Sequence, residues 1–106
     1  YRHRACRTQL APTSGAMGYG WPAAIAAKAV DREREAICVA GDGDFLMTGQ
    51  EMATAMQHGL NPVVIVVDNA TYGTIRMHQE GHYPGAERVI ATDLKNPDFV
   101  LWAQAF

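Results

Sequence analysis

The sequence predicts an α/β fold, with a doubly wound, mostly parallel sheet that has helices on both faces. Two short apolar stretches, 36–40 and 63–67, each end in a polar cluster. The segment between them is long enough for one helix and its two loops, which is the connection that two parallel strands require. Strand-like and helix-like segments alternate along the chain, as they do in this fold class.

Length and composition limit the possible functions. The 106 residues fit at most one domain, and a net charge of −2 leaves no basic patch for nucleic acid and no polybasic segment for a membrane surface. No apolar run approaches the roughly 18 residues of a membrane span. Cys6 and Cys38 lack the spacing of a zinc site, and Cys38 is expected to be buried. These features favour a cytoplasmic setting.

Both ends of the domain are expected to be truncated. The chain begins at Tyr1 rather than at a methionine and ends at Phe106, within a predicted helix. Asn96 is the expected N-cap of that helix and Pro97 its first residue. Apolar residues then recur at helical spacing, at Phe99, Trp102, Ala103 and Phe106. We therefore expect residues 1–106 to form part of a domain in a longer polypeptide.

The first half of the chain reads as a loop, a glycine-rich turn and a helix. Residues 1–14 are irregular, and 15–20 form the turn. Pro22 is expected to open an alanine-rich helix that runs to about Val30, with side chains small enough for close approach to the sheet. The alternating charges of 31–35 indicate a solvated loop or helix end.

The second half begins with the 36–40 strand, whose apolar character is typical of a strand covered on both faces. Thr48 and Glu51 predict a capping box that opens the next helix, and Gly59 predicts its end. The β-branched run 63–67 predicts the second strand.

Weaker signals follow the second strand. Residues 70–79 predict a turn and a helix, and 81–85 predict a loop. Residues 89–91 predict a short third strand.

Polar residues follow both of the strands predicted at 36–40 and 63–67. Asp42 lies just after the first strand and Asn69 just after the second. Because the carboxyl ends of parallel strands share one edge of a sheet, with neighbours about 4.8 Å apart, the two side chains can converge on one small ligand. Carboxylate and amide oxygens suit Mg²⁺ or Ca²⁺. The sequence therefore predicts a divalent-cation site at this edge.

Three sequence blocks resemble thiamine-diphosphate-dependent enzymes, most closely the acetolactate synthase group. They are 13–25, which resembles the segment around the cofactor ring, together with 41–47 and 50–54. Gly41-Asp42-Gly43, followed by Asp68-Asn69, resembles the family's Gly-Asp-Gly and Asn-Asn signature. Asp68 departs from this signature, which has an asparagine at that position. An aspartate accepts backbone hydrogen bonds as asparagine does, but it cannot donate one and it adds negative charge near the diphosphate.

The resemblance implies a C-terminal diphosphate-binding domain that holds thiamine diphosphate and Mg²⁺. The implied metal ligands are the Asp42 carboxylate, the Asn69 side-chain oxygen and the Thr71 backbone carbonyl. The implied cofactor-binding residues are Gly15, Ala16, Met17, Gly41, Asp42, Gly43, Asp44, Asn69, Thr71, Tyr72 and Gly73.

Within that set, the resemblance assigns different parts of the cofactor to different segments. Gly15 and Met17 would contact the aminopyrimidine ring through their backbone, and the Met17 side chain would hold the cofactor bent. The alternative for Met17 is a core residue before a helix. Gly41 and Gly43 would allow close approach of the diphosphate. Backbone N–H groups of Gly43 and Asp44, at the start of a helix, would point at it, and Tyr72 and Gly73 could add donors.

The implied activity is decarboxylation of a small 2-oxo acid, followed by carboligation or release of an aldehyde. The activating glutamate is expected on the pyrimidine-binding domain of a partner subunit, so no catalytic residue is assigned here and the intact enzyme would be a homodimer or tetramer. The sequence does not choose between an acetolactate synthase and a benzoylformate, indolepyruvate or oxalyl-type decarboxylase.

Other interpretations are weaker. A dinucleotide-binding module would need a third glycine where Leu46 stands. A non-catalytic relative that kept only the fold would not need Asp42 and Asn69 together. His78 and His82 are more simply surface residues than substrate contacts. The basic start of the chain, with Arg2, Arg4 and Arg7, is more simply a solvated terminus than a phosphate site.

Overall fold

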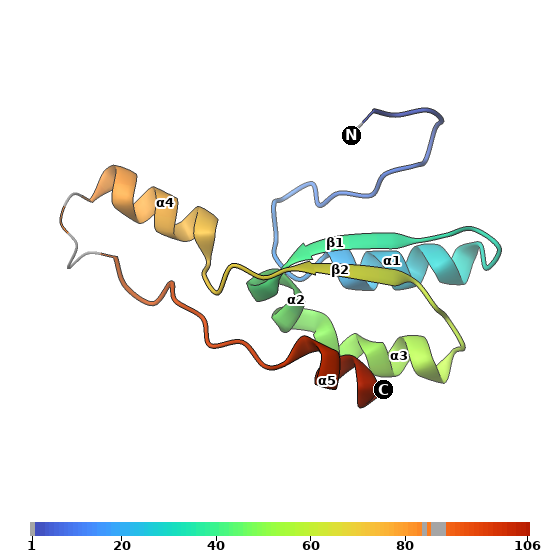
Figure 1. Cartoon of the computed structure of the whole chain (residues 1–106). Coiled ribbons are helices and arrows are strands. Elements are labelled where there is room, and N and C mark those ends of the chain that lie inside the picture. The colour runs from blue at the N-terminus through green and yellow to red at the C-terminus, as the bar shows by residue number, and fades with distance from the viewer. Residues whose placement is uncertain (1, 84, 86–88) are drawn as a thin grey trace.

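The computed structural model describes residues 2–83, 85 and 89–106, and shows a two-stranded sheet with short helices packed on one face, while the helix of residues 73–82 lies apart from the sheet (Figure 1). In chain order the elements are α1 (Gly20–Val30), β1 (Ile37–Gly41), α2 (Asp42–Thr48), a 3₁₀ turn (Gly49–Glu51), α3 (Met52–Gln57), β2 (Val63–Val67), α4 (Gly73–His82) and α5 (Phe99–Gln104).

The predicted parallel strand pair is confirmed. β1 and β2 run in the same direction, in a register that pairs Ile37 with Val63 at one end and Gly41 with Val67 at the other. The connection between them passes through α2, the 3₁₀ turn and α3. This is the helical crossover that parallel strands need, and it brings both strand carboxyl ends to the same edge.

The two faces of the sheet differ in exposure. On one face, Cys38 and Ala40 are buried and Val64 and Val66 are partly buried against the helices. The side chains of the other face are 47–67% exposed, and they are Ile37, Val39, Val63, Ile65 and Val67. Within the described part of the chain the α/β class is confirmed, and helices on both faces stay a prediction.

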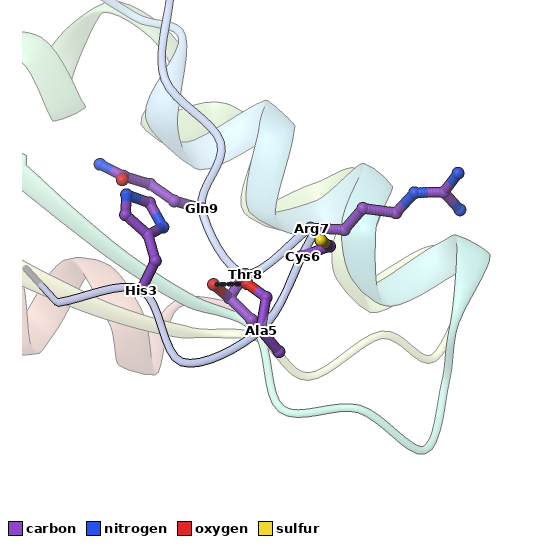
Figure 2. A pocket seen from close by; sticks show the side chains of 6 residues that line it. All are labelled: His3, Ala5, Cys6, Arg7, Thr8 and Gln9. Carbon is purple, nitrogen blue, oxygen red and sulfur yellow. Dashed lines mark hydrogen bonds between the residues drawn. The ribbon is translucent and has the colours of Figure 1, made fainter.

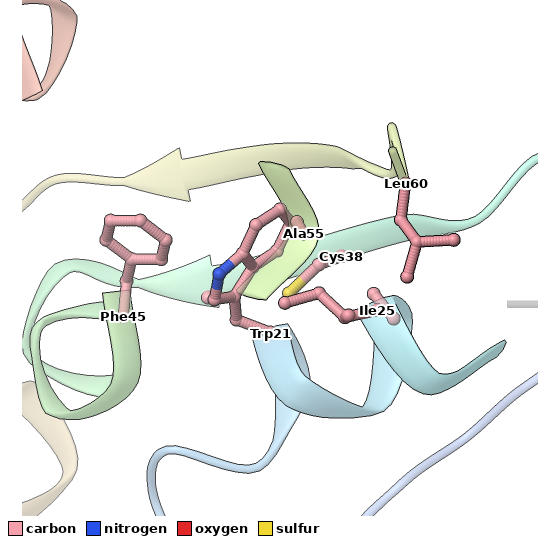
Figure 3. Packing of buried hydrophobic residues seen from close by; sticks show 8 residues of the cluster. Trp21, Ile25, Cys38, Phe45, Ala55 and Leu60 are labelled. Carbon is pink, nitrogen blue, oxygen red and sulfur yellow. The ribbon is translucent and has the colours of Figure 1, made fainter. Parts of the chain in front are cut away.

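Phe45 is buried in the core that joins the helices to the sheet, and Figure 3 shows it at one end of this cluster, with Trp21 as its labelled neighbour. Its ring makes edge-on contacts with Trp21 of α1 and with Phe99 and Trp102 of α5, at centroid distances of 5.9–6.4 Å. Edge-to-face aromatic pairs of this kind add to the stability from area burial. The aromatic cluster therefore ties the C-terminal α5 to the first half of the chain.

The predicted capping box at Thr48 is wrong. The helix begins earlier, at Asp42, immediately after β1, and Thr48 is the last residue of α2. The Thr48 hydroxyl donates to the carbonyl of Gly18 at 3.0 Å instead of capping a helix, and Glu51 accepts from Thr54. A tertiary contact thus takes the hydroxyl that the local pattern assigned to the helix terminus.

The predicted helix stop at Gly59 is confirmed. Gly59 has a φ of +59°, its N–H donates to Met56, and the N–H of Leu60 donates to Ala55. This is the Schellman arrangement, which favours glycine because a Cβ strains the left-handed conformation. α1 also matches its prediction closely, beginning two residues before Pro22.

Three predictions in the last third of the chain are wrong. Residues 89–91 form no strand, and the described segment that follows them makes an isolated antiparallel bridge between Thr71 and Asp93. α4 continues to His82, into the predicted 81–85 loop, where Pro84 lies outside the described residues. Asp98, rather than Asn96, caps α5 by accepting from two backbone N–H groups.

Two further observations concern exposure. None of the helices in the described ranges is long and apolar enough to cross a membrane. Cys38 is buried as expected, and Cys6 is exposed.

Candidate cofactor and metal site

The residues predicted to bind a cation lie at the carboxyl edge of the sheet. Gly41 pairs with Val67 at the end of the parallel ladder, so Asp42 and Asp68 follow on adjacent strands. Asn69 and Thr71 continue from β2, in the loop that leads to α4 (Figure 1). The strand register therefore brings the two predicted ligand segments to one place, although they are far apart in sequence.

Asp42 is 2% exposed and is held by hydrogen bonds at both oxygens. Its Oδ1 accepts from the N–H of Gly43 at 2.9 Å, and its Oδ2 accepts from the Asn96 side-chain amide at 2.6 Å. Burial by itself raises the pKa of Asp42. Hydrogen bonds from Asn96 and from the N–H groups of Gly43 and Ala70 outweigh burial, so the pKa lies below its usual value. Asp42 is consequently an anion at neutral pH.

Asn96 is a site residue that the sequence interpretation missed. Its amide nitrogen donates to Asp42 Oδ2 and also to Asp68 Oδ1, at 2.7 Å. The local pattern assigned Asn96 to the N-cap of α5, a place that Asp98 fills in the structure. The sequence does contain a signal for this. Asp98, two positions later, is also a good capping residue, so Asn96 is not needed as the cap.

The loop after β2 is braced by its own side chains. Asp68 Oδ1 accepts from the N–H of Ala70 at 3.0 Å, and Asn69 Oδ1 accepts from the N–H of Thr71 at 3.2 Å. Ala70 has a φ of +54°, a conformation that such tight side-chain-to-backbone turns help to hold. Asp68 thus braces this loop as an acceptor, and the Asn69 oxygen stays at the exposed surface.

Thr71 and Tyr72 are anchored to Thr92, a buried residue that the sequence interpretation did not single out. The Thr92 carbonyl accepts from the Thr71 hydroxyl and from the N–H of Tyr72, each at 2.8 Å. The N–H of Gly73 donates to the Thr71 carbonyl at 2.9 Å. The N–H groups of Tyr72 and Gly73, suggested as phosphate donors, are therefore already used within the protein. The Thr71 carbonyl oxygen has a second lone pair, which the hydrogen bond from Gly73 does not use.

The two glycines that flank Asp42 have different surroundings. A Cβ on Gly43 would overlap the Tyr72 ring, coming within 2.7 Å of its Cδ1, so the fold itself requires a glycine there. No atom of the described residues lies within 4 Å of a Cβ added to Gly41, and Gly41 has an ordinary φ of −67°. The protein does not need a glycine at position 41. The open space beside its backbone suits the close approach of an external group.

The glycine-rich segment is fastened to α2 through Gly18. The N–H of Gly18 donates to Asp44 Oδ1 at 2.6 Å, and its carbonyl accepts from Thr48. Gly18 has a φ of +83°, and an added Cβ would lie 3.2 Å from atoms of Met47 and Thr48. The Asp44 side chain therefore joins the two segments that the resemblance assigned to different parts of the cofactor.

The residues assigned to the cofactor ring lie in an open part of this segment. Gly15 and Ala16 are exposed, and Gly15 has a φ of +65°. Met17 is 39% exposed, so the structure does not support its alternative interpretation as a core residue. The contacts of these three residues with a ring stay a prediction.

Other candidate features lie away from the sheet edge. A hollow of about 480 Å³ is bordered by residues of the N-terminal segment alone, including Cys6 and Arg7, and Figure 2 shows the Arg7 side chain extending away from His3. The rings of His78 and His82 are 5.7 Å apart on the exposed surface of α4. Within the described ranges, no group of three or more His, Cys, Asp or Glu side chains could hold a metal ion.

The donor set at the sheet edge fits a hard divalent cation all the same. It offers one ionised carboxylate, one amide oxygen and one backbone carbonyl, from Asp42, Asn69 and Thr71. Mg²⁺ prefers such oxygen ligands and is commonly bound by few protein groups together with substrate phosphates. The open backbone at Gly41 lies next to this set, so a metal-bound diphosphate fits the residues present.

Comparison with known proteins decides the family. The model of the thiamine pyrophosphate enzyme family, C-terminal TPP binding domain, matches residues 1–106. The chain belongs to this family. Its match covers every segment of the site described above, from Gly15 to Asn96.

Individual members of the thiamine pyrophosphate enzyme family agree with this assignment. The chain is 40% identical over 94 residues to the acetolactate synthase large subunit of Parasynechococcus marenigrum, covering 87% of the chain and 15% of that protein. It is 37% identical over 93 residues to the acetolactate synthase isozyme 2 large subunit of Escherichia coli, covering 87% of the chain and 17% of that protein.

One relative has a different name. The chain is 38% identical over 108 residues to the probable 2-ketoarginine decarboxylase AruI of Pseudomonas aeruginosa, covering 100% of the chain and 19% of that protein. The chain thus spans less than one fifth of the length of these relatives.

Proposed function

We propose that residues 1–106 are part of the domain that binds thiamine diphosphate and Mg²⁺ in a 2-oxo acid decarboxylase or carboligase, most like acetolactate synthase. The observation that carries the proposal is the buried, ionised Asp42 at the carboxyl edge of a parallel strand pair, beside the Asn69 loop. A family match over the whole chain supports it. The doubly wound sheet with helices on both faces is part of this proposal, and would be completed by segments outside the described residues.

Asp42, Asn69 and the Thr71 carbonyl would hold Mg²⁺, which would offset the repulsion between the Asp42 carboxylate and a diphosphate. The backbone at Gly41 would lie closest to the diphosphate, because it has no Cβ and none of the described residues fills the space where a Cβ would stand. Gly43 and Asp44, in the first turn of α2, would add the favourable field of a helix start. Gly15, Ala16 and Met17 would line the pyrimidine ring.

When bound, thiamine diphosphate supplies the electron sink that decarboxylation of a 2-oxo acid needs. The residues of this chain bind and orient it. Asp44 and Thr48 set the position of the Gly18 segment relative to α2, and so fix the ring-binding residues relative to the diphosphate-binding residues. None of the described residues is assigned as the activating acid, which we expect to be a glutamate on the pyrimidine-binding domain of a partner subunit.

Two reaction outcomes are compatible with the site. Several relatives are named acetolactate synthases, which favours carboligation after decarboxylation. The relative named as a probable 2-ketoarginine decarboxylase is as similar and matches the whole chain, which keeps release of an aldehyde open. A homodimer or tetramer and a cytoplasmic location stay predictions.

Calorimetry on the intact polypeptide that carries this chain tests the proposal. Thiamine diphosphate should bind in the presence of Mg²⁺ and lose most of its affinity when Mg²⁺ is chelated. Asp42→Ala should abolish the Mg²⁺-dependent part of binding, and Asp42→Asn, which keeps the shape of the side chain, should do the same. Undiminished metal-dependent affinity in both variants would refute the ligand role.

Asp31→Asn is a matched control, because Asp31 is an exposed carboxylate in the loop after α1 that bonds only to nearby backbone N–H groups among the contacts described. It should bind cofactor like the wild type. The products that the enzyme forms from a panel of 2-oxo acids, including 2-ketoarginine, then identify the reaction. A carboligase forms a new carbon–carbon bond, whereas a decarboxylase releases an aldehyde.

A further inference from the structure

The Asn96 side chain lies between the carboxylates of Asp42 and Asp68. Its amide nitrogen is 2.6 Å from Asp42 Oδ2 and 2.7 Å from Asp68 Oδ1. These residues come from the end of β1, the end of β2 and the segment before α5, and Asn96 is 54 positions from Asp42. One neutral side chain thus connects three distant parts of the chain at the sheet edge.

The chemistry of an amide suits this place. A primary amide nitrogen carries two N–H groups, so it can donate one to each carboxylate. Hydrogen bonds to carboxylates are stronger than those between neutral groups. Two carboxylates at adjacent strand ends repel each other, and the amide offsets this repulsion without adding a positive charge. The edge therefore keeps its negative charge, which a cation needs.

The aspartate at position 68 gives the two hydrogen bonds of the Asn96 amide a larger role in this chain. The resemblance expects an asparagine at position 68, which would accept the same hydrogen bond and add no charge. With aspartate there, Asp42 has a second carboxylate within hydrogen-bonding reach. Asn96 supplies the donor that lies between these two side chains.

We propose that Asn96 is a positioning residue for the divalent cation, holding the Asp42 carboxylate in place while offsetting its repulsion by Asp68. This inference rests on the proposed function, because it takes Asp42 as a metal ligand. Residues that hydrogen-bond to metal ligands orient them, and their loss typically weakens metal binding by about 10–100-fold. Asn96 contributes to metal affinity through Asp42 rather than by contact with the metal.

A purely structural role makes a different prediction. Asn96 could simply fasten the segment before α5 to the sheet, in which case any weakening of that segment should affect the metal equally. Asp98 offers the comparison, because it caps α5 two residues away and its side chain bonds only to the N–H groups of Val100 and Leu101 among the contacts described. Asp98→Ala should lower the melting temperature and leave the Mg²⁺ affinity unchanged.

The experiment is a titration of Mg²⁺ into the intact polypeptide at fixed thiamine diphosphate, followed by calorimetry, with the melting temperature measured in parallel without metal. Asn96→Ala should weaken Mg²⁺ binding about tenfold, and Asn96→Asp, which replaces the donor with a third carboxylate, about 100-fold. Adding Asp68→Asn to Asn96→Asp swaps the two side chains, so that position 68 carries the amide and position 96 the carboxylate. The total charge is then the same as in the wild type. This double variant should recover at least about tenfold of the lost affinity.

The outcomes separate the two levels of the proposal. If the wild type shows no Mg²⁺-dependent binding, the proposed function fails. If the wild type binds and both Asn96 variants bind equally well, the positioning role is overturned while the proposed function stands. The positioning role is also overturned if Asp98→Ala weakens binding as much as Asn96→Ala, or if the exchanged pair folds without recovering affinity. Should Asn96→Ala fail to fold, the exchanged pair still gives the decisive measurement.

Discussion

The Asp44 carboxylate accepts the backbone N–H of Gly18 at 2.6 Å, across 26 positions of sequence. Thr48, one helical turn later, donates to the carbonyl of the same residue. Both polar backbone groups of Gly18 are therefore held by α2, which begins at the diphosphate-binding segment. This pair of contacts within the protein joins the two halves of the proposed cofactor site.

Asp44→Ala is expected to release the Gly18 segment. A lost hydrogen bond to a charged group costs about 1.5–3 kcal/mol, and Asp44→Asn should cost far less because its amide oxygen still accepts the N–H. Hydrogen exchange measured by mass spectrometry should show faster exchange in the peptide that contains Gly18 for the alanine variant only. Equal exchange in the wild type and the alanine variant would contradict this role of Asp44.

Gly41 and Gly43 should respond to alanine in opposite ways. Gly43→Ala would overlap the Tyr72 ring, and overpacking of this kind costs about 1–3 kcal/mol, so the melting temperature should fall. Gly41→Ala places a Cβ with no neighbour within 4 Å in the described part of the chain and should leave the melting temperature unchanged. Its thiamine diphosphate affinity should nevertheless fall, because the Cβ fills the space beside the diphosphate.

Melting curves without ligand and calorimetry with thiamine diphosphate and Mg²⁺ check the two glycines separately. The expected result is one variant defective in folding and one defective in binding. A Gly41→Ala protein that binds cofactor as tightly as the wild type would argue against the position of the diphosphate proposed here.

Asp42 should make stability depend on acid pH. Its pKa in the folded protein lies below the ordinary value of 3.8, so its ionised form contributes stability that is fully present above that value. This contribution is lost as the pH falls through the lower pKa of the folded state. The difference in unfolding free energy between the wild type and Asp42→Asn should be constant near neutral pH and shrink below about pH 4.

Denaturant unfolding of the metal-free protein between pH 3 and pH 7, followed by tryptophan fluorescence, measures this difference. Trp21 packs against Phe45 in the core and reports its loss. A difference that grows as the pH falls would mean that burial, rather than the hydrogen bonds from Asn96 and Gly43, dominates the pKa of Asp42.

The two cysteines should differ in reactivity. Burial, reinforced by the negative charge of Asp44, raises the pKa of Cys38 above 9.0, whereas Cys6 is exposed. Because the thiolate is the reactive form, iodoacetamide at pH 8 should label Cys6 in the native protein and label Cys38 only after denaturation. Peptide mass spectrometry distinguishes the sites, and rapid native labelling of Cys38 would show that β1 is accessible from its helix-covered face.

Local features whose causes lie within a few residues can be predicted from the amino-acid order. The β-branched run 63–67 predicts a strand wherever it packs, and Gly59 ends its helix because the left-handed conformation favours glycine. Parallel strands need a long crossover that is usually helical, so the helix-length segment between 36–40 and 63–67 predicts that Asp42 and Asn69 share one edge of the sheet. The sequence resemblance added the cofactor, and the family match agrees.

The partners of the polar side chains depend on contacts between distant parts of the fold. Thr48 and Asn96 both had the local pattern of helix caps, yet one bonds to Gly18 and the other to two carboxylates. The spacing of nearby residues contains no information about partners 30 or 54 positions away. A side chain with several possible acceptors takes the one that the assembled fold brings within reach, so these contacts depend on the packing of α1, α2 and the two strands.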